Sequence, residues 1–196
     1  MSQVRLKAVD FLLHRNSIQK YQDLMESQYD SYENLCQTQD VKLKKIVEYA
    51  YNTTKYYRNL MNKLKISPED IRCQDDLYKL PIVTKEIIRQ DPESFLSSEM
   101  NNHHSRMVKT GGSTGVPLKY YISGNFDGYV WGSIWRAWSV GGYSLGDKVA
   151  VLGGDRVSKK GLKHKLYQFL NNWENINVTD LNDHNLQHMY QKPNPL

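Results

Sequence analysis

The sequence has few cysteines and no long hydrophobic run, and each absence excludes a class of protein. Its two cysteines, Cys36 and Cys73, lie far apart without any C-x-x-C pair, which excludes a disulfide framework and a zinc knuckle. The longest apolar stretch near the N-terminus, residues 8–13, is interrupted by Asp10 and has no small-residue cleavage site after it. We therefore expect no signal peptide and no transmembrane segment, and a cytoplasmic protein with reduced cysteines.

The composition is that of a globular chain with a basic balance. Of its 196 residues, 39% are hydrophobic and 24% charged, and this composition excludes a disordered chain. The formal net charge is +5, which favours anionic partners. The lysines between residues 42 and 65 fall on the polar side of helical patterns. A denser group lacks the interleaved aromatic residues that stack on bases; it comprises Lys159, Lys160, Lys163, His164 and Lys165. We therefore expect no nucleic-acid partner.

Hydrophobic periodicity predicts that the chain as a whole is α/β and that it has two regions. The first, over 1–104, is mainly helical, and the second, over 105–196, contains both strands and helices. Residues 1–66 carry apolar side chains at helical spacing, which predicts two helices or one helix bent at 52–54. Ser67-Pro68 and Thr84 are typical of helix N-termini, and they predict short helices after each, the second over 85–90. Residues 106–109 and 118–122 are predicted strands.

The second region continues with a predicted buried helix capped by Asn125. This helix carries Trp131, Trp135 and Trp138, which we interpret as core residues, with an aromatic acyl pocket as the alternative. An interior strand is predicted over 149–152, followed by a basic amphipathic stretch over 159–172 and a polar helix over 182–191.

Two groups of histidines, one of them with nearby acidic residues, are candidates for chemistry. His184 and His188 stand four apart near Asp180 and Asp183, but no third ligand completes a metal pattern, so we expect a solvated helix and no metal site. The pair His103-His104 precedes the first predicted strand, which favours a loop or edge position over a general-base role.

The stretch Thr110-Gly111-Gly112-Ser113-Thr114-Gly115-Val116-Pro117 contains the most informative pattern in the chain. Glycines allow backbone N–H groups to turn toward an anion, and Ser and Thr hydroxyls donate further hydrogen bonds to phosphate oxygens. The spacing excludes a Walker loop, since no lysine follows a glycine at the required place. The composition therefore predicts a phosphate-binding loop, and a solvent-exposed hairpin turn is the alternative.

This loop, read as T-G-G-S-T-G-V-P-L, resembles the signature loop of adenylate-forming enzymes, in particular their phenylacetate–CoA ligase-like branch with the CapK capsular polysaccharide biosynthesis proteins. Three other segments are similar to that branch in the same order: Tyr56-Tyr57-Arg58, Leu80 to Lys85, and Gly146-Asp147. Two positions depart from the wider pattern, because Gly111 replaces a usual hydroxyl residue and Leu118 replaces a frequent lysine.

The resemblance implies that a carboxylate attacks the α-phosphate of ATP to give an acyl-adenylate and pyrophosphate, after which a thiol such as coenzyme A displaces AMP. It implies a phosphate site formed by Thr110, Gly111, Gly112, Ser113, Thr114 and Gly115, with Mg²⁺ sharing the charge. ATP and a small carboxylate would be the ligands. The catalytic residues stay unassigned.

The resemblance also implies a fold in which N-terminal helices precede the beginning of the large adenylate-forming, acyl-CoA synthetase-like domain. Members of the family are longer, so we expect this nucleotide-binding region to be incomplete at its C-terminus and inactive alone. Whether a second polypeptide completes it stays open at the level of the sequence. Two functions stay open: a part of a ligase in capsular or surface polysaccharide biosynthesis, and a non-catalytic binding or scaffold module of such a pathway.

Overall fold

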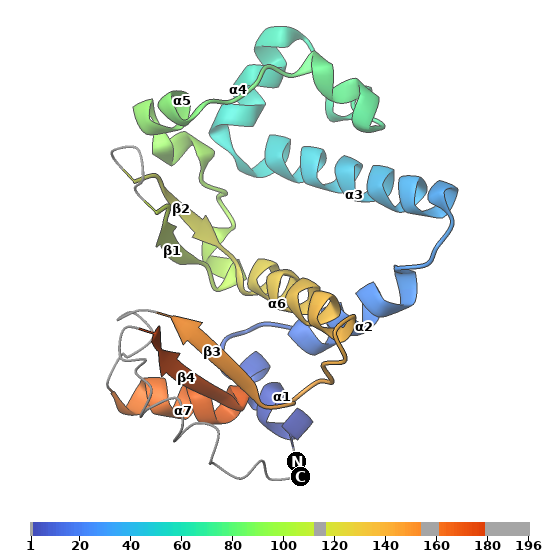
Figure 1. The fold of residues 1–196 in the computed structure, drawn as a ribbon. Helices are drawn as coiled ribbons and strands as arrows, with labels where there is room; N and C mark the ends of the chain where they lie inside the picture. The colour runs from blue at the N-terminus through green and yellow to red at the C-terminus, as the bar shows by residue number, and fades with distance from the viewer. Residues whose placement is uncertain (1, 112–116, 154–160, 179–196) are drawn as a thin grey trace, which may run out of the picture.

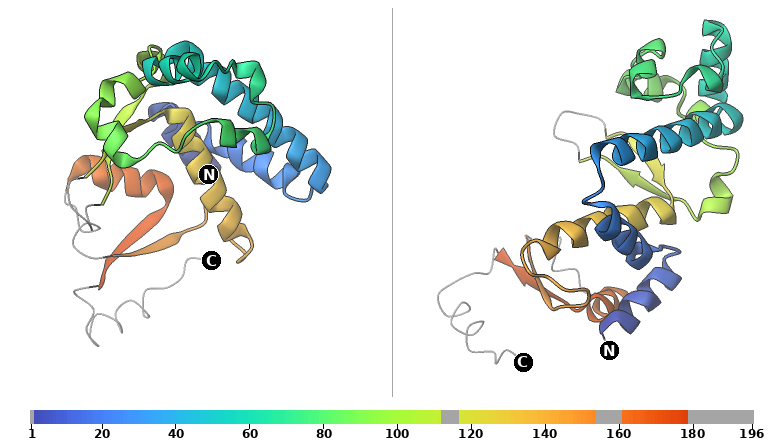
Figure 2. Two further views of the ribbon diagram at one scale, coloured as in Figure 1. Left: turned by 90° about the horizontal axis from the view of Figure 1, so that it is seen from above. Right: turned by 90° about the vertical axis from the view of Figure 1, so that its right-hand side faces the viewer.

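The fold is known from a computed structural model that describes residues 2–111, 117–153 and 161–178. The chain is mixed α/β and mostly helical, with two small sheets. Figure 1 shows the long helix α3 (Tyr32–Thr53) and the short helices beyond it toward one end of the molecule, two strands and a helix around residues 149–177 at the other, and helix α6 (Gly124–Ser139) between them. The same order along the molecule is seen in the right-hand view of Figure 2.

The N-terminal part forms four helices where the sequence predicted two. They are α1 (Ser2–Leu12), α2 (Ser17–Ser27), α3 (Tyr32–Thr53) and α4 (Lys55–Leu64). The break predicted at 52–54 is confirmed, because Thr54 has an extended backbone between α3 and α4. The additional start at α3 has a local cause: the Ser31 hydroxyl accepts a hydrogen bond from the Asn34 amide at 3.2 Å.

Short helices follow, and a small core holds them on α3 and α4. The elements are η1 (Pro68–Asp70), η2 (Gln74–Lys79), α5 (Lys85–Gln90), η3 (Pro92–Phe95) and η4 (Met100–His103). The starts predicted at Ser67 and Thr84 are confirmed, as is the end of α5 at Gln90. The core beneath them consists of Val47, Met61 and Ile71, with Leu43, Tyr51, Ile66 and Leu80 packed around it.

The second half contains a hairpin, a helix and a β-α-β unit. Strand β1 (Arg106–Lys109) pairs antiparallel with β2 (Lys119–Ile122), and helix α6 (Gly124–Ser139) follows. Strand β3 (Val149–Gly153) pairs parallel with β4 (Trp173–Asn177), and α7 (Leu162–Asn171) connects them. Both strands of the predicted hairpin are confirmed.

Helix α6 differs from its prediction in two respects. Its N-cap is Ser123, whose hydroxyl accepts a hydrogen bond from the Phe126 amide at 3.1 Å, so the predicted cap at Asn125 is wrong. Its burial is also one-sided: Trp135 is buried together with three glycines spaced four residues apart, Gly124, Gly128 and Gly132, whereas Phe126 is exposed. The glycine face packs closely against α2 and the turn before it.

Strand β3 was predicted to be interior, and the described residues do not place it there. It pairs with β4 alone among them, and the Leu152 side chain is 63% exposed. The apolar composition of this strand predicted burial, but the described sheet has only two strands, so β3 has a paired neighbour on one side only within it. The predicted helix over 182–191 lies outside the described residues, and the division at 104 and 105 stays a prediction.

Candidate functional site

The candidate site is built on the β1–β2 hairpin, which carries the predicted phosphate-binding loop. Val108 lies opposite Tyr120, and Lys109 lies opposite Lys119. Beyond that last pair, the Thr110 amide donates to the Leu118 carbonyl at 3.0 Å. The Leu118 amide donates in turn to Thr110 Oγ1 at 2.9 Å. These two hydrogen bonds close the neck of the loop.

Of the six predicted phosphate-binding residues, the structure describes Thr110 and Gly111. Gly112, Ser113, Thr114 and Gly115 lie outside the described residues. Thr110 Oγ1 accepts the Leu118 amide, and its hydroxyl hydrogen is still able to donate to another acceptor. A Cβ atom built on Gly111 would meet no heavy atom of the described residues within 4 Å. The described protein therefore leaves space beside Gly111, which is consistent with a ligand site.

A cavity of about 850 Å³ runs along β2, directly after the loop. Leu118 and Lys119 belong to its lining, so the C-terminal end of the loop lies at its edge. The other walls come from α3, α5, the η3–η4 segment, β1 and the start of α6. The lining is mainly apolar and includes Ile46, Ile88, Phe95, Leu96, Met100, Met107, Tyr121 and Phe126. An apolar cavity of this size is typical of a site for a small organic molecule.

One wall of this cavity carries a hydrogen-bonded polar cluster. The Tyr49 hydroxyl lies 2.8 Å from Ser97 Oγ and 3.0 Å from His103 Nε2. His103 Nε2 also lies 3.8 Å from Glu99 Oε2. Such a cluster can orient a polar group of a ligand or pass a proton along its hydroxyls, because the Tyr49 and Ser97 hydroxyls can each both donate and accept.

Known proteins provide one comparison. No family model matches the chain. Over 85 residues the chain is 28% identical to the phenylacetate-coenzyme A ligase of Thermus thermophilus. That stretch is 43% of this chain and 19% of the ligase. The similarity supports a distant relationship to an adenylate-forming ligase, and the finer assignment to CapK proteins stays a prediction.

The tryptophans of α6 do not line the large cavity. Trp135 is buried, Trp131 packs on Trp173 with ring centroids 5.1 Å apart, and Trp138 contacts Tyr143 edge-on. The prediction that they are core residues is therefore favoured over an acyl pocket at that cavity. Trp131 is half-buried and lines a second, smaller cavity.

Sequence reasoning did not find Tyr49 and Ser97, which form the polar cluster of the large cavity. Tyr49 and Ser97 meet across 48 positions, and no local motif joins them. His103, placed correctly outside the strands, ends η4 and contacts Tyr49. In the part of the chain that the structure describes, no group of His, Cys, Asp and Glu has the arrangement of a metal site, and no helix is long and apolar enough to cross a membrane. His184 and His188 lie outside that part.

Proposed function

We propose that the loop over 110–117 binds the phosphates of ATP and that the chain forms part of an adenylate-forming ligase. The observation that carries this proposal is the hydrogen-bonded pair Thr110 and Leu118, which brings together the two ends of a sequence rich in small and hydroxyl residues, with Leu118 at the edge of the 850 Å³ cavity. The distant similarity to phenylacetate-coenzyme A ligase supports the same conclusion.

The loop contributes to the reaction by positioning and by charge. Backbone amides and the hydroxyls of Thr110, Ser113 and Thr114 would donate to the β- and γ-phosphate oxygens, whose negative charge grows as pyrophosphate leaves. Mg²⁺ would share that charge, bound mainly to the phosphates and to water. The open space beside Gly111 is compatible with a phosphate group there.

The cavity would hold the carboxylate that ATP activates. Its apolar walls fit an organic body, and the Tyr49–His103 pair offers a polar contact within it. No described residue favours any of four further points, which stay predictions. They are a thiol acceptor such as coenzyme A, a role in capsule or surface polysaccharide assembly, completion by a second polypeptide, and a purely scaffolding role.

The direct test is nucleotide affinity measured by calorimetry. If the loop holds the triphosphate tail, affinity falls in the order MgATP, MgADP, AMP, with about tenfold or more between the first and the last. A chain that binds AMP as tightly as MgATP, or that binds none of the three, would contradict the proposal.

A further inference from the structure

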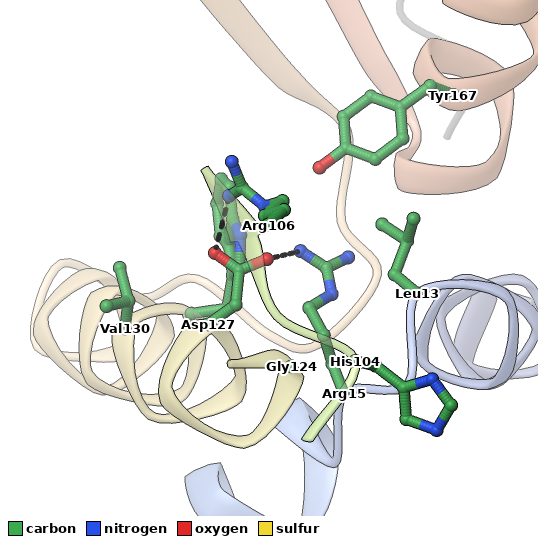
Figure 3. A pocket seen from close by; sticks show the side chains of 9 residues that line it. Leu13, Arg15, His104, Arg106, Gly124, Asp127, Val130 and Tyr167 are labelled. Atoms are coloured by element: carbon green, nitrogen blue, oxygen red, sulfur yellow. Dashed lines mark hydrogen bonds and ion pairs between the residues drawn. The ribbon is translucent and has the colours of Figure 1, made fainter. Parts of the chain in front are cut away.

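A second cavity, of about 380 Å³, lies at the opposite end of the hairpin from the loop. It is bordered by the end of α1, the start of β1, the first turns of α6 and one face of α7. Figure 3 shows the side chains that line it, among them Arg15, Arg106, Asp127 and Tyr167. Thr110 and Gly111, the phosphate-binding residues that the structure describes, do not line this cavity.

Arg15 is the unusual residue in this cavity because its charge is buried. The side chain is 2% exposed. Its Nη1 donates to Asp127 Oδ2 at 3.4 Å, and its Nε lies 3.9 Å from Asp10 Oδ1 without forming a hydrogen bond. An arginine has five N–H groups, and the described residues accept one of those on Arg15. Among these donors, Nε is buried without any hydrogen-bond partner in the described protein, and a buried charged donor of this kind is unfavourable unless another acceptor is present.

The neighbouring carboxylates do not supply that acceptor. Asp10 accepts hydrogen bonds from the Ser17 hydroxyl and the Ile18 amide. Asp127 is shared, because its Oδ1 also accepts from Arg106 Nη2 at 3.2 Å. The cavity lining therefore contains two guanidinium groups and one carboxylate, and α6 adds the positive end of its dipole where it starts at Gly124.

The remaining walls define what kind of anion fits. The Tyr167 hydroxyl points toward the two guanidinium groups (Figure 3) and has no hydrogen-bond partner among the described residues. Leu13, Val130 and Trp131 provide apolar surface, and the Arg15 guanidinium carbon lies 5.8 Å from the Trp131 ring centroid. One side of the cavity offers hydrogen-bond donors and the other offers hydrocarbon and aromatic contact.

We propose that this cavity binds a small organic anion, with a carboxylate or phosphate group on Arg15, Arg106 and Tyr167 and an apolar body against Trp131 and its neighbours. The anion would satisfy donors that the described protein leaves unpaired. This site goes beyond the proposed ATP site and does not depend on it.

The test uses two anions and one neutral compound of similar shape, measured by calorimetry on the purified protein without nucleotide. Benzoate and phenyl phosphate represent the two oxyanion classes, and benzamide is the neutral counterpart of benzoate. We expect at least one anion to bind with a Kd of about 1 mM or tighter, and benzamide to bind about tenfold more weakly. The tighter of the two anions identifies the class.

Two variants and a matched control connect binding to the residues. Arg106→Gln changes a side chain that is 59% exposed, and Tyr167→Phe removes only a hydroxyl, so neither is expected to unfold the protein. Arg106→Gln should weaken anion binding about tenfold and Tyr167→Phe about threefold or more. Arg89→Gln, which alters an arginine in the surface ion pair with Glu86, should leave it unchanged.

Three results would overturn the proposal. Absence of binding by both anions would mean that water alone satisfies the donors. Equal binding of benzoate and benzamide would exclude charge recognition. Unchanged affinity in both Arg106→Gln and Tyr167→Phe would place any bound anion elsewhere. Because the assay contains no nucleotide, failure here would leave the ATP proposal unaffected, and loss of ATP binding would leave this one unaffected.

Discussion

Thr110 and Leu118 form a reciprocal pair at the neck of the loop, the amide of each donating to an oxygen of the other. One of the two acceptors is a side-chain oxygen, Thr110 Oγ1, so residue 110 determines whether the neck closes fully. The sequence reasoning assigned this hydroxyl to phosphate binding. Its structural role comes in addition, because an accepting hydroxyl retains its own hydrogen.

We predict that Thr110→Val lowers the free energy of unfolding by about 1 kcal/mol, because valine preserves the shape and leaves the Leu118 amide without its acceptor. Thr110→Ser retains the oxygen and should remain close to wild type. Urea unfolding of the three proteins checks this. A valine variant as stable as the serine variant would show that the side-chain bond contributes nothing.

The two ion pairs of Asp127, with Arg15 and with Arg106, should contribute differently to stability. Asp127→Asn leaves the buried Arg15 without a full counter-charge, and we expect a loss of about 3 kcal/mol of stability. Arg106→Gln removes the exposed partner of the same carboxylate, and it should cost less than about 1 kcal/mol. Denaturant unfolding gives both values. Equal losses would contradict the assigned burial of Arg15.

The glycine face of α6 allows a close approach that a methyl group would prevent. A Cβ atom on Gly124 would collide with the His14 carbonyl, whereas one on Gly141 would come no nearer than 3.4 Å to the Trp138 carbonyl oxygen. We therefore expect Gly124→Ala to reduce stability by about 2 kcal/mol or more, and Gly141→Ala to have little effect. Thermal unfolding of both variants compares the two positions, and a stable Gly124→Ala protein would contradict this packing.

Asp76 should make stability depend on acid pH. Lys79 Nζ donates to its carboxylate at 2.6 Å, and the amides of Arg72 and Cys73 also donate, so the pKa of Asp76 lies well below its ordinary value. A lowered folded-state pKa stabilises the fold above the ordinary aspartate pKa, about 4, and this contribution disappears as the pH falls below that value toward the folded-state pKa.

Asp76→Asn should therefore lower the urea midpoint near neutral pH, and the difference from wild type should shrink at acid pH. Asp75→Asn, at the exposed neighbouring position, is the control and should change the midpoint little. Midpoints measured at about pH 7, 5 and 3 test the trend. A difference that stays constant over this range would show that the charge of Asp76 is not responsible.

Local signals in the sequence predicted much of the fold. Thr84 places a hydroxyl before a short helix, and it accepts the Ile87 amide as expected. The strand-like runs at 106–109 and 118–122, on either side of a loop of small residues, predicted the hairpin and the position of the loop. The cap of α6 was missed because Ser123 and Asn125 are both good caps, and Gly124 between them gives no sign that the helix has already begun.

Long-range relationships could not be predicted. Arg15 and Asp127 are separated by 112 positions, and both resemble ordinary surface charges in the sequence. Likewise, Tyr49 gives no sign that it will reach Ser97 and His103. Hydrophobic periodicity indicated that α6 packs, but its packing face is made of glycines, which periodicity does not register.

Ser113 and Thr114 are proposed to take part in holding the phosphates of ATP, and MgATP affinity measured on the double variant Ser113→Ala/Thr114→Ala tests this most directly. We predict that the variant unfolds at the same urea concentration as wild type and binds MgATP about tenfold or more weakly, because two hydroxyl donors to a charged group are lost. MgATP affinity equal to that of wild type would contradict the account.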